Sequence, residues 1–200
     1  MTTSQTHRTE VGSQSLELPL VELADDLAVA LLITVDHGVA FAARAGEELA
    51  ALLVDRQIDV VVSVATMGIP LAIETTRALG LDDYVILHKT RKIHLADGEW
   101  EPVRSITTDA VQALGFDRAR LGAVVGRRVA IIDDVISTGG SIVAATNLVR
   151  RVGGVPVALG CLVTEGDAWV HALGDDASLV CSLGSLPLFG RAAGGAWSPR

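Results

Sequence analysis

The sequence predicts an α/β protein with a parallel sheet and helices on both of its faces. Short runs of β-branched and aliphatic residues recur along the chain, and most are followed by a stretch with helical periodicity. Crossovers between such strands are right-handed and give a parallel sheet. Half of the 200 residues are hydrophobic and only 4% are aromatic. We therefore expect a full-sized core made mostly of Ala, Val, Leu and Ile.

Composition also limits the partners of the protein. The formal net charge is −8, which argues against general binding to nucleic acid. No apolar run is long enough to span a bilayer, and the first residues contain no signal-peptide core. Cys161 and Cys181 lie in apolar stretches typical of buried, reduced thiols. These features predict a cytoplasmic protein that binds neither nucleic acid nor membrane.

The N-terminal part of the chain predicts a tail, one strand and two helices. Residues 1–14 are polar and are expected to form a loosely held tail. Residues 15–20 (SLELPL) alternate apolar and polar side chains, and Pro19 suits an edge strand. From about Asp25 to Val54 the pattern is helical, with a break expected at His37 and Gly38.

The rest of the chain supplies the strands of the parallel sheet. Ligands of such sheets gather at the carboxyl ends of the strands, so the loops after Ala65, Leu87 and Ile132 are candidate ligand loops. The predicted strands are residues 58–65 (IDVVVSVA), 84–89 (YVILHK), 129–134 (VAIIDD), 155–165 (VPVALGCLVTE) and 178–184 (SLVCSLG).

The stretch 129–141 (VAIIDDVISTGGS) carries the most specific chemistry. Asp133 and Asp134 follow a buried strand, and a turn of small residues then leads into a helix. Backbone N–H groups at a helix N-terminus bind phosphate well. Carboxylates beside a phosphate site fit a ligand that also carries sugar hydroxyls or a metal. An ordinary capped turn explains one Asp and one Gly, but not the whole pattern. The turn consists of Ser137, Thr138, Gly139, Gly140 and Ser141.

The segment DDVISTGGS resembles the phosphoribosyl-pyrophosphate (PRPP) motif of type I phosphoribosyltransferases. Both have an apolar strand, two acids, two variable residues, a small residue, Thr-Gly-Gly and a hydroxyl residue. The resemblance covers about residues 58–165 and is closest to the adenine/purine branch. It implies a Rossmann-like core with a small hood and a homodimer. Its expected parts are residues 1–24 (tail and hood strand), 25–170 (core, with a mobile loop at about 90–110) and 171–200 (C-terminal hood segment).

The resemblance also implies roles for individual residues. Asp133 and Asp134 would hold the ribose hydroxyls, and the 137–141 turn would hold the 5′-phosphate. Lys89 and, after closure of the mobile loop, Arg104 would complete the catalytic set. Mg²⁺ is the expected cofactor, bound through PRPP oxygens with Asp133 as the one candidate protein ligand. Pyrophosphate would contact Ala65, Thr66, Met67, Gly68, Lys89 and Arg91, and the base would contact Val135, Ile136, Glu165 and Phe189.

This chain departs from the family pattern at two points. Thr66 and Met67 stand where many members carry a basic residue. The aromatic–acidic pair that adenine enzymes carry on the mobile loop cannot be placed here, so the base stays open. Plainer explanations also stand: a simple turn at 65–68, a solvated loop around Arg91, a β-hairpin at 94–109 and core packing for the apolar base-site candidates.

Together these features predict transfer of 5-phosphoribosyl from PRPP to a nitrogenous base, expected to be an adenine-like purine, in base salvage. The products would be a nucleoside 5′-monophosphate and pyrophosphate. One alternative is a PRPP-sensing regulatory protein without transferase activity. Another is a different transfer or lyase reaction on the same fold. A P-loop nucleotide binder is disfavoured because the sequence lacks G-x-x-x-x-G-K-[ST].

Overall fold

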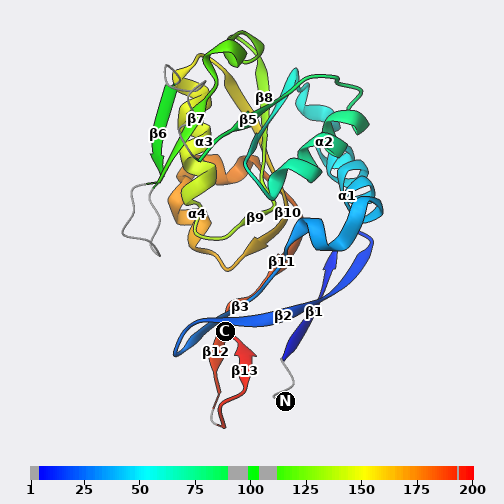
Figure 1. The fold of residues 1–200 in the computed structure, drawn as a ribbon, viewed down its shortest axis with the longest axis vertical. Helices are drawn as coiled ribbons and strands as arrows, with labels where there is room; N and C mark the ends of the chain where they lie inside the picture. The colour runs from blue at the N-terminus through cyan, green and yellow to red at the C-terminus, as the bar shows by residue number, and fades with distance from the viewer. Residues whose placement is uncertain (1–4, 90–98, 104–111, 193) are drawn as a thin grey trace.

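The computed structural model describes residues 5–89, 99–103, 112–192 and 194–200. Two large sheets dominate it: a six-stranded parallel sheet flanked by helices, and a five-stranded antiparallel sheet below it in Figure 1. We call the antiparallel sheet the outer sheet. The first described strand of the chain and its C-terminus both lie at the outer sheet (Figure 1). The predicted α/β class with a parallel sheet is confirmed.

The parallel sheet has the strand order β11-β10-β8-β4-β5, and a short strand, β9, also pairs with β10. Every residue of β4 is buried, as expected for a valine-rich strand covered on both faces. Because β4, β8 and β10 are neighbours, the loops that follow them open at the same edge of the sheet. The strands are β4 (Val60–Val64), β5 (Tyr84–Leu87), β8 (Arg128–Ile132), β9 (Val135–Ile136), β10 (Val155–Glu165) and β11 (Val180–Leu186).

Helices cover the two faces of this sheet. Val61 and Ala130 belong to the core formed with α1 and α2, whereas Val62 and Ile131 belong to the core formed with α3. This alternation is the two-residue period of a strand buried on both sides. Figure 1 shows the two helix layers on opposite sides. The helices are α1 (Gly38–Leu53), α2 (Gly68–Ala78), α3 (Gly140–Arg151) and α4 (Ala168–Leu173), with 3₁₀ turns η1 (Thr34–His37), η2 (Val54–Arg56), η4 (Arg118–Ala123) and η5 (Gly174–Leu179).

The outer sheet corrects two predictions for the N-terminal part. Within the predicted tail, residues 6–11 form β1, with Thr9 and Val11 buried on one face. Residues 27–30, predicted to be helical, form β3 between β2 and β12. A four-residue apolar run fits either state, and strand pairing decides between them. The outer sheet consists of β1 (Thr6–Val11), β2 (Gln14–Ala24), β3 (Leu27–Ala30), β12 (Phe189–Arg191) and β13 (Trp197–Pro199).

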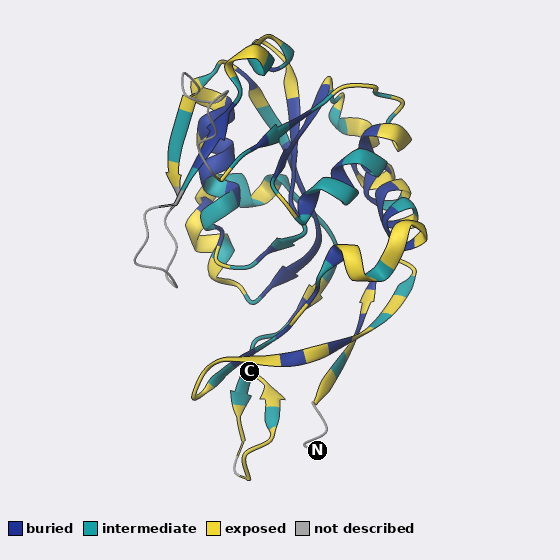
Figure 2. Ribbon diagram, in the orientation of Figure 1, coloured by how far each residue is buried: buried dark blue, intermediate teal, exposed yellow. Residues whose placement is uncertain are grey.

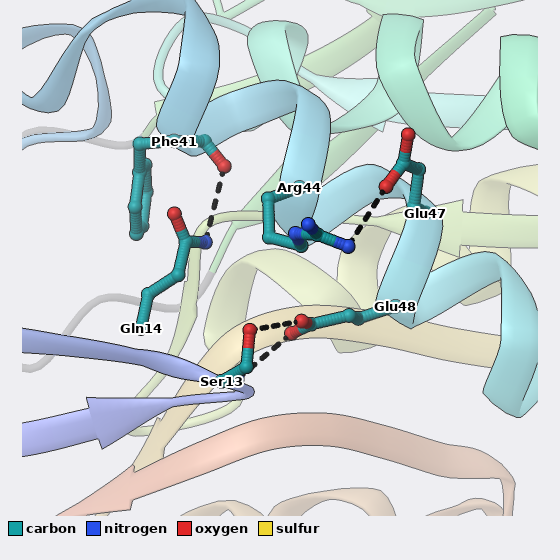
Figure 3. A network of polar contacts seen from close by, with 6 residues as sticks. All are labelled: Ser13, Gln14, Phe41, Arg44, Glu47 and Glu48. Atoms are coloured by element: carbon teal, nitrogen blue, oxygen red, sulfur yellow. Dashed lines mark hydrogen bonds and ion pairs between the residues drawn. The ribbon is translucent and has the colours of Figure 1, made fainter.

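The turn between β1 and β2 fastens the outer sheet to the core (Figure 3). The backbone N–H and hydroxyl of Ser13 both donate hydrogen bonds to the Glu48 carboxylate on α1. Gln14 Nε2 donates to the Phe41 carbonyl over 3.2 Å. Gly12 N–H donates to the Leu183 carbonyl of β11 over 2.8 Å. The outer sheet is therefore held to both α1 and β11. Its strands are more exposed to solvent than the strands of the parallel sheet (Figure 2).

A second antiparallel pair lies over α3. It consists of β6 (Glu99–Val103) and β7 (Gln112–Phe116). Arg151 of α3 pairs with Glu101 and donates to the Trp100 carbonyl over 3.0 Å. The predicted mobile loop falls mostly on residues 90–98 and 104–111, which lie outside the described residues. Where the chain is described, no helix is long and apolar enough to cross a membrane.

Candidate functional site

The acidic pair follows β8 at the carboxyl edge of the parallel sheet. The Asp133 side chain is buried, with 8% of its surface exposed. Asp133 Oδ1 accepts a hydrogen bond from the Asp134 backbone N–H over 3.0 Å. Burial raises the pKa of Asp133 well above its usual value, the charge of Asp134 raises it further, and the charge of Lys89 opposes the shift. The pair thus consists of two carboxyl groups, one of them largely removed from water, that can form hydrogen bonds with the hydroxyls of a ligand.

The predicted phosphate turn leads from β9 into α3. Gly139 has φ of +84°, a left-handed conformation that suits glycine. A Cβ atom there would lie only 2.9 Å from the Ala172 Cβ and 3.3 Å from the Trp169 Cα, so α4 also requires glycine at this position. The turn surrounds a cavity of about 110 Å³ lined by residues 135–142. Because α3 begins at Gly140, its free N–H groups lie at this cavity.

A second loop, residues 65–68, joins β4 to α2 beside the acidic pair. The peptide bond between Ala65 and Thr66 is cis. A Cβ atom on Gly68 would lie 2.8 Å from Ser63 Oγ and 3.0 Å from the Asp133 Cα, so only glycine allows this approach. Thr66 is exposed and Met67 is half-buried. The start of α2 therefore packs directly against the acidic residue at the end of β8.

Lys89 brings a positive charge to the same edge. It follows β5, which pairs with β4, and its side chain is exposed. Its charge lowers the pKa of Asp133, so the two groups interact electrostatically. Ala65 N–H donates to the Leu87 carbonyl over 3.0 Å, which joins the 65–68 loop to the end of β5. Arg91 and Arg104, with their predicted contacts, lie outside the described residues.

Glu165 ends β10 and lies behind the phosphate turn. Its carboxylate Oε2 accepts a hydrogen bond from Ser137 Oγ over 2.7 Å, and 8% of the residue is exposed. Burial raises the pKa of Glu165, and the hydrogen bond from Ser137 opposes this shift. The sequence analysis predicts that Glu165 contacts the base. In the structure, its side chain instead accepts a hydrogen bond from the turn that is expected to hold the phosphate.

The other base-site candidates lie mainly in packed surroundings. Val135 and Ile136 form β9, which pairs with β10 at Val163 and Thr164. Ile136 is 2% exposed and belongs to the core on the α3 side. Phe189 is also 2% exposed, and its ring meets His7 edge-on at 5.0 Å between centroids within the outer sheet. Contact of these residues with a base stays a prediction.

Several contacts of the site were not predictable from one stretch of sequence. Ser63 is fully buried under Gly68, and its hydroxyl has no hydrogen-bond partner within the described residues. Ala172 and Trp169 of α4 pack against Gly139. Trp169 Nε1 donates to the Gly166 carbonyl over 3.1 Å, which fixes α4 beside Glu165. The only signal for these contacts was that loops at the carboxyl ends of parallel strands converge.

The donor set suits a metal ion that takes most of its ligands from a substrate and water. Across the described ranges, no three His, Cys, Asp or Glu side chains gather in a way that could hold a metal ion. The site instead offers the two adjacent carboxylates of Asp133 and Asp134. Mg²⁺ commonly binds through one or two carboxylates together with phosphate oxygens and water. The residues present therefore fit Mg²⁺ bound jointly with a phosphorylated ligand.

Comparison with known proteins identifies the family. The model of the phosphoribosyl transferase domain matches residues 37–190. The chain is 32% identical over 117 residues to a hypoxanthine/guanine phosphoribosyltransferase of Methanococcus voltae, covering 57% of each chain. It is 30% identical over 120 residues to the purine biosynthesis repressor of Bacillus subtilis, covering 60% of this chain and 41% of that one. The chain thus spans less than two thirds of these curated relatives.

A solved structure shares the fold. The adenine phosphoribosyltransferase of Saccharomyces cerevisiae superposes with a TM-score of 0.61 and 18% identity, covering 89% of this chain and 93% of the yeast one. At this identity the likeness concerns the fold alone. The domain match, in contrast, extends over most of the chain and includes the loops after β4, β5, β8 and β10. The chain belongs to the phosphoribosyl transferase domain family.

Proposed function

We propose that the protein transfers 5-phosphoribosyl from PRPP to a purine base, as a step of base salvage in the cytoplasm. The products are a nucleoside 5′-monophosphate and pyrophosphate. One observation carries the proposal: at one edge of the sheet, the acidic pair lies against the 65–68 loop and directly before the 137–141 turn, which lines a cavity. We propose that both loops bind anions. A purine acceptor is supported by the relatives, which are named for hypoxanthine, guanine and adenine.

Each part of the site has a role in this reaction. Asp133 and Asp134 accept hydrogen bonds from the ribose 2′- and 3′-hydroxyls. The 137–141 turn and the N-terminus of α3 hold the 5′-phosphate. The backbone of the 65–68 loop, Thr66 and Lys89 hold the pyrophosphate, with Arg91 and Arg104 proposed as further contacts. Holding both ends fixes the anomeric carbon between the base and the leaving group.

The reaction exchanges one bond at the anomeric carbon. The bond from C1′ to the pyrophosphate oxygen breaks, and a bond from C1′ to a base nitrogen forms. Positive charge develops on the ribose and negative charge on the leaving pyrophosphate. Lys89 stabilises the pyrophosphate charge, and the carboxyl groups of buried Asp133 and half-buried Asp134 lie near the ribose charge. The rate enhancement is therefore expected to come from positioning and charge stabilisation.

Mg²⁺ is the proposed cofactor. Oxygens of PRPP and water would hold most of its coordination positions, with Asp133 as the candidate protein ligand. When bound, the ion supplies positive charge to the pyrophosphate oxygens. The two carboxylates would in addition keep the ribose hydroxyls in place.

We propose that the outer sheet acts as the hood over the base. Two residues, Pro187 and Leu188, connect β11 of the core to β12 of the outer sheet. Leu188 also lies close to Gly166, directly after Glu165. We further propose a homodimer, which is supported by the exposed Val35 in η1 and Val39 at the start of α1. Sedimentation of the purified protein tests this assembly.

Pyrophosphate release from PRPP with Mg²⁺ and a panel of purine and pyrimidine bases tests the function. The expected result is turnover with at least one purine. Saturable PRPP binding without turnover on any base would contradict the transferase and favour the sensing alternative. Absence of PRPP binding would contradict the site itself.

A further inference from the structure

The hydrogen bond between Ser137 and Glu165 raises a question that the proposed reaction does not answer. Ser137 lines the cavity of about 110 Å³ that is expected to receive the 5′-phosphate. Its hydroxyl proton is donated to Glu165 over 2.7 Å. A serine hydroxyl has only one proton to donate. With Glu165 ionised, Ser137 would present only lone pairs to an incoming phosphate.

Charge repulsion adds to this conflict. A bound phosphate dianion would be separated from the buried Glu165 carboxylate by little more than the Ser137 hydroxyl. A like charge at short range disfavours ionisation of a carboxyl group. Burial already raises the pKa of Glu165, and the hydrogen bond from Ser137 opposes this shift. The binding of phosphate, like burial, should therefore raise the pKa of Glu165.

The surroundings of Glu165 offer it no compensating cation among the described neighbours. Asp133 and Asp134 precede β9, and Asp167 precedes α4. Neither these acids nor a cation is a cause of the shift in the pKa of Glu165, which comes from burial and from the Ser137 hydrogen bond. In β11, the residue paired with Glu165 is the apolar Leu186. Lys89 follows β5, and the charge with which it interacts belongs to Asp133. The neutral form of Glu165 is therefore the form compatible with a bound phosphate.

We propose that Glu165 and Ser137 form a carboxyl–hydroxyl relay behind the 5′-phosphate, a role that rests on the function proposed above. As the phosphate binds, Glu165 takes up one proton from solvent. The protonated carboxyl then donates its hydrogen bond to Ser137 Oγ, and Ser137 turns its own proton onto a phosphate oxygen. No other bond is made or broken. Glu165 is thus a positioning residue that acts through Ser137.

The relay makes binding of the 5′-phosphate depend on pH. The pKa of Glu165 must be higher in the complex than in the free protein. Between these two pKa values, each binding event takes up one proton, so affinity falls by about tenfold for each unit rise in pH. Outside this window, Glu165 contributes no pH dependence.

Calorimetric titration with ribose 5-phosphate tests the relay, because this ligand carries the 5′-phosphate without the pyrophosphate. Titrations at several pH values, in buffers with different ionisation enthalpies, report the protons taken up. Glu165→Gln keeps the shape, is neutral at every pH and can donate its amide proton to Ser137. We expect the variant to take up fewer protons than the wild type and to bind about tenfold more tightly at the alkaline end. The ionisation of the ligand is common to both proteins and cancels in the comparison.

Glu48→Gln is the matched control, because Glu48 also accepts a hydrogen bond from a serine hydroxyl but lies at the anchor on α1 (Figure 3). It should retain the wild-type pH dependence. Ser137→Ala removes the hydrogen bond that favours ionised Glu165 in the free protein and also the link between Glu165 and the phosphate, so this variant should take up fewer protons on binding than the wild type. Equal proton uptake by wild type and Glu165→Gln would overturn the relay. If Glu165→Gln does not fold, proton uptake by Ser137→Ala equal to that of the wild type would overturn it. A wild type that binds no ribose 5-phosphate at any pH would instead contradict the proposed function.

Discussion

The two loops of the site that we propose to bind anions, 137–141 and 65–68, are built in different ways. The 137–141 turn contributes three hydroxyl side chains, a left-handed glycine and the N-terminus of α3. The 65–68 loop contributes one hydroxyl, that of Thr66, and the nearby positive charge comes from Lys89 on another strand end. In the proposed reaction, the first loop keeps its phosphate throughout, whereas the second must release pyrophosphate. The phosphate that stays bound is thus held by one continuous turn, whereas the pyrophosphate that is released is held by groups from separate elements.

The largest expected effect comes from the acidic pair between the two loops. We expect the double variant Asp133→Asn with Asp134→Asn to reduce kcat/KM by about 10³-fold, since it removes the charged contacts to ribose. Pyrophosphate release and PRPP titration measure the change. Because both loops remain intact, weak binding of ribose 5-phosphate and of pyrophosphate should survive. Unchanged PRPP affinity in the double variant would exclude the ribose role.

A smaller effect is expected where the 65–68 loop meets Asp133. In Gly68→Ala the new Cβ would collide with Ser63 Oγ and the Asp133 backbone, so the start of α2 must shift. We expect this shift of α2 to lower kcat/KM by about 10²-fold. The affinity for pyrophosphate should fall more than the affinity for ribose 5-phosphate. Gly122→Ala is the control, because a Cβ there has no neighbour within 4 Å among the described residues. Full activity of Gly68→Ala would show that this close contact is not required.

A substitution of Lys89 tests whether the two loops bind different ligands. Lys89→Gln removes the positive charge beside the 65–68 loop and should weaken pyrophosphate binding about tenfold. Ribose 5-phosphate, held by the other loop, should bind as before, and Lys89→Arg should restore part of the lost affinity. Competition titrations with the two ligands distinguish these effects. Equal weakening of both ligands would contradict the division of the site into two ends.

The smallest expected effect is on stability. The folded state raises the pKa of Asp133 above its ordinary value of 3.8, so folded protein binds the proton more tightly than unfolded protein. Wild-type stability should therefore fall as pH rises from 3.8 toward the raised pKa. Asp133→Asn should be more stable than wild type at neutral pH, by about 1 kcal/mol, with the difference vanishing in acid. Urea unfolding at pH values across this range provides the measurement. A variant less stable at neutral pH would contradict the burial of charge at the site.

The sequence was sufficient for the parts of the molecule that are encoded in continuous stretches. The acidic pair and the phosphate turn lie within nine consecutive residues, 133–141, so strand, turn and helix could be predicted together. Contacts between distant segments could not. The hydrogen bond between Ser137 and Glu165 depends on β9 lying beside β10, and the contact of Gly68 with Asp133 depends on β4 lying beside β8. Alternation of strands and helices does not specify this strand order.

In the outer sheet, secondary structure also depends on contacts between distant segments that the local sequence does not reveal. Residues 27–30 (LAVA) are compatible with a helix by composition, but β2 and β12 supply partners for their backbone groups. The strand at residues 6–11 has a polar sequence and gains its order from pairing with β2 over its whole length. Pairing between segments far apart in the chain thus overrode local preference.

Competition calorimetry with PRPP, ribose 5-phosphate and pyrophosphate, all with Mg²⁺, tests the two-ended site most directly. We predict that PRPP binds with one molecule per chain and displaces either smaller ligand. Ribose 5-phosphate and pyrophosphate should bind together, because each occupies its own loop. Mutual exclusion of the two smaller ligands, or PRPP binding that displaces neither of them, would contradict this account of the site.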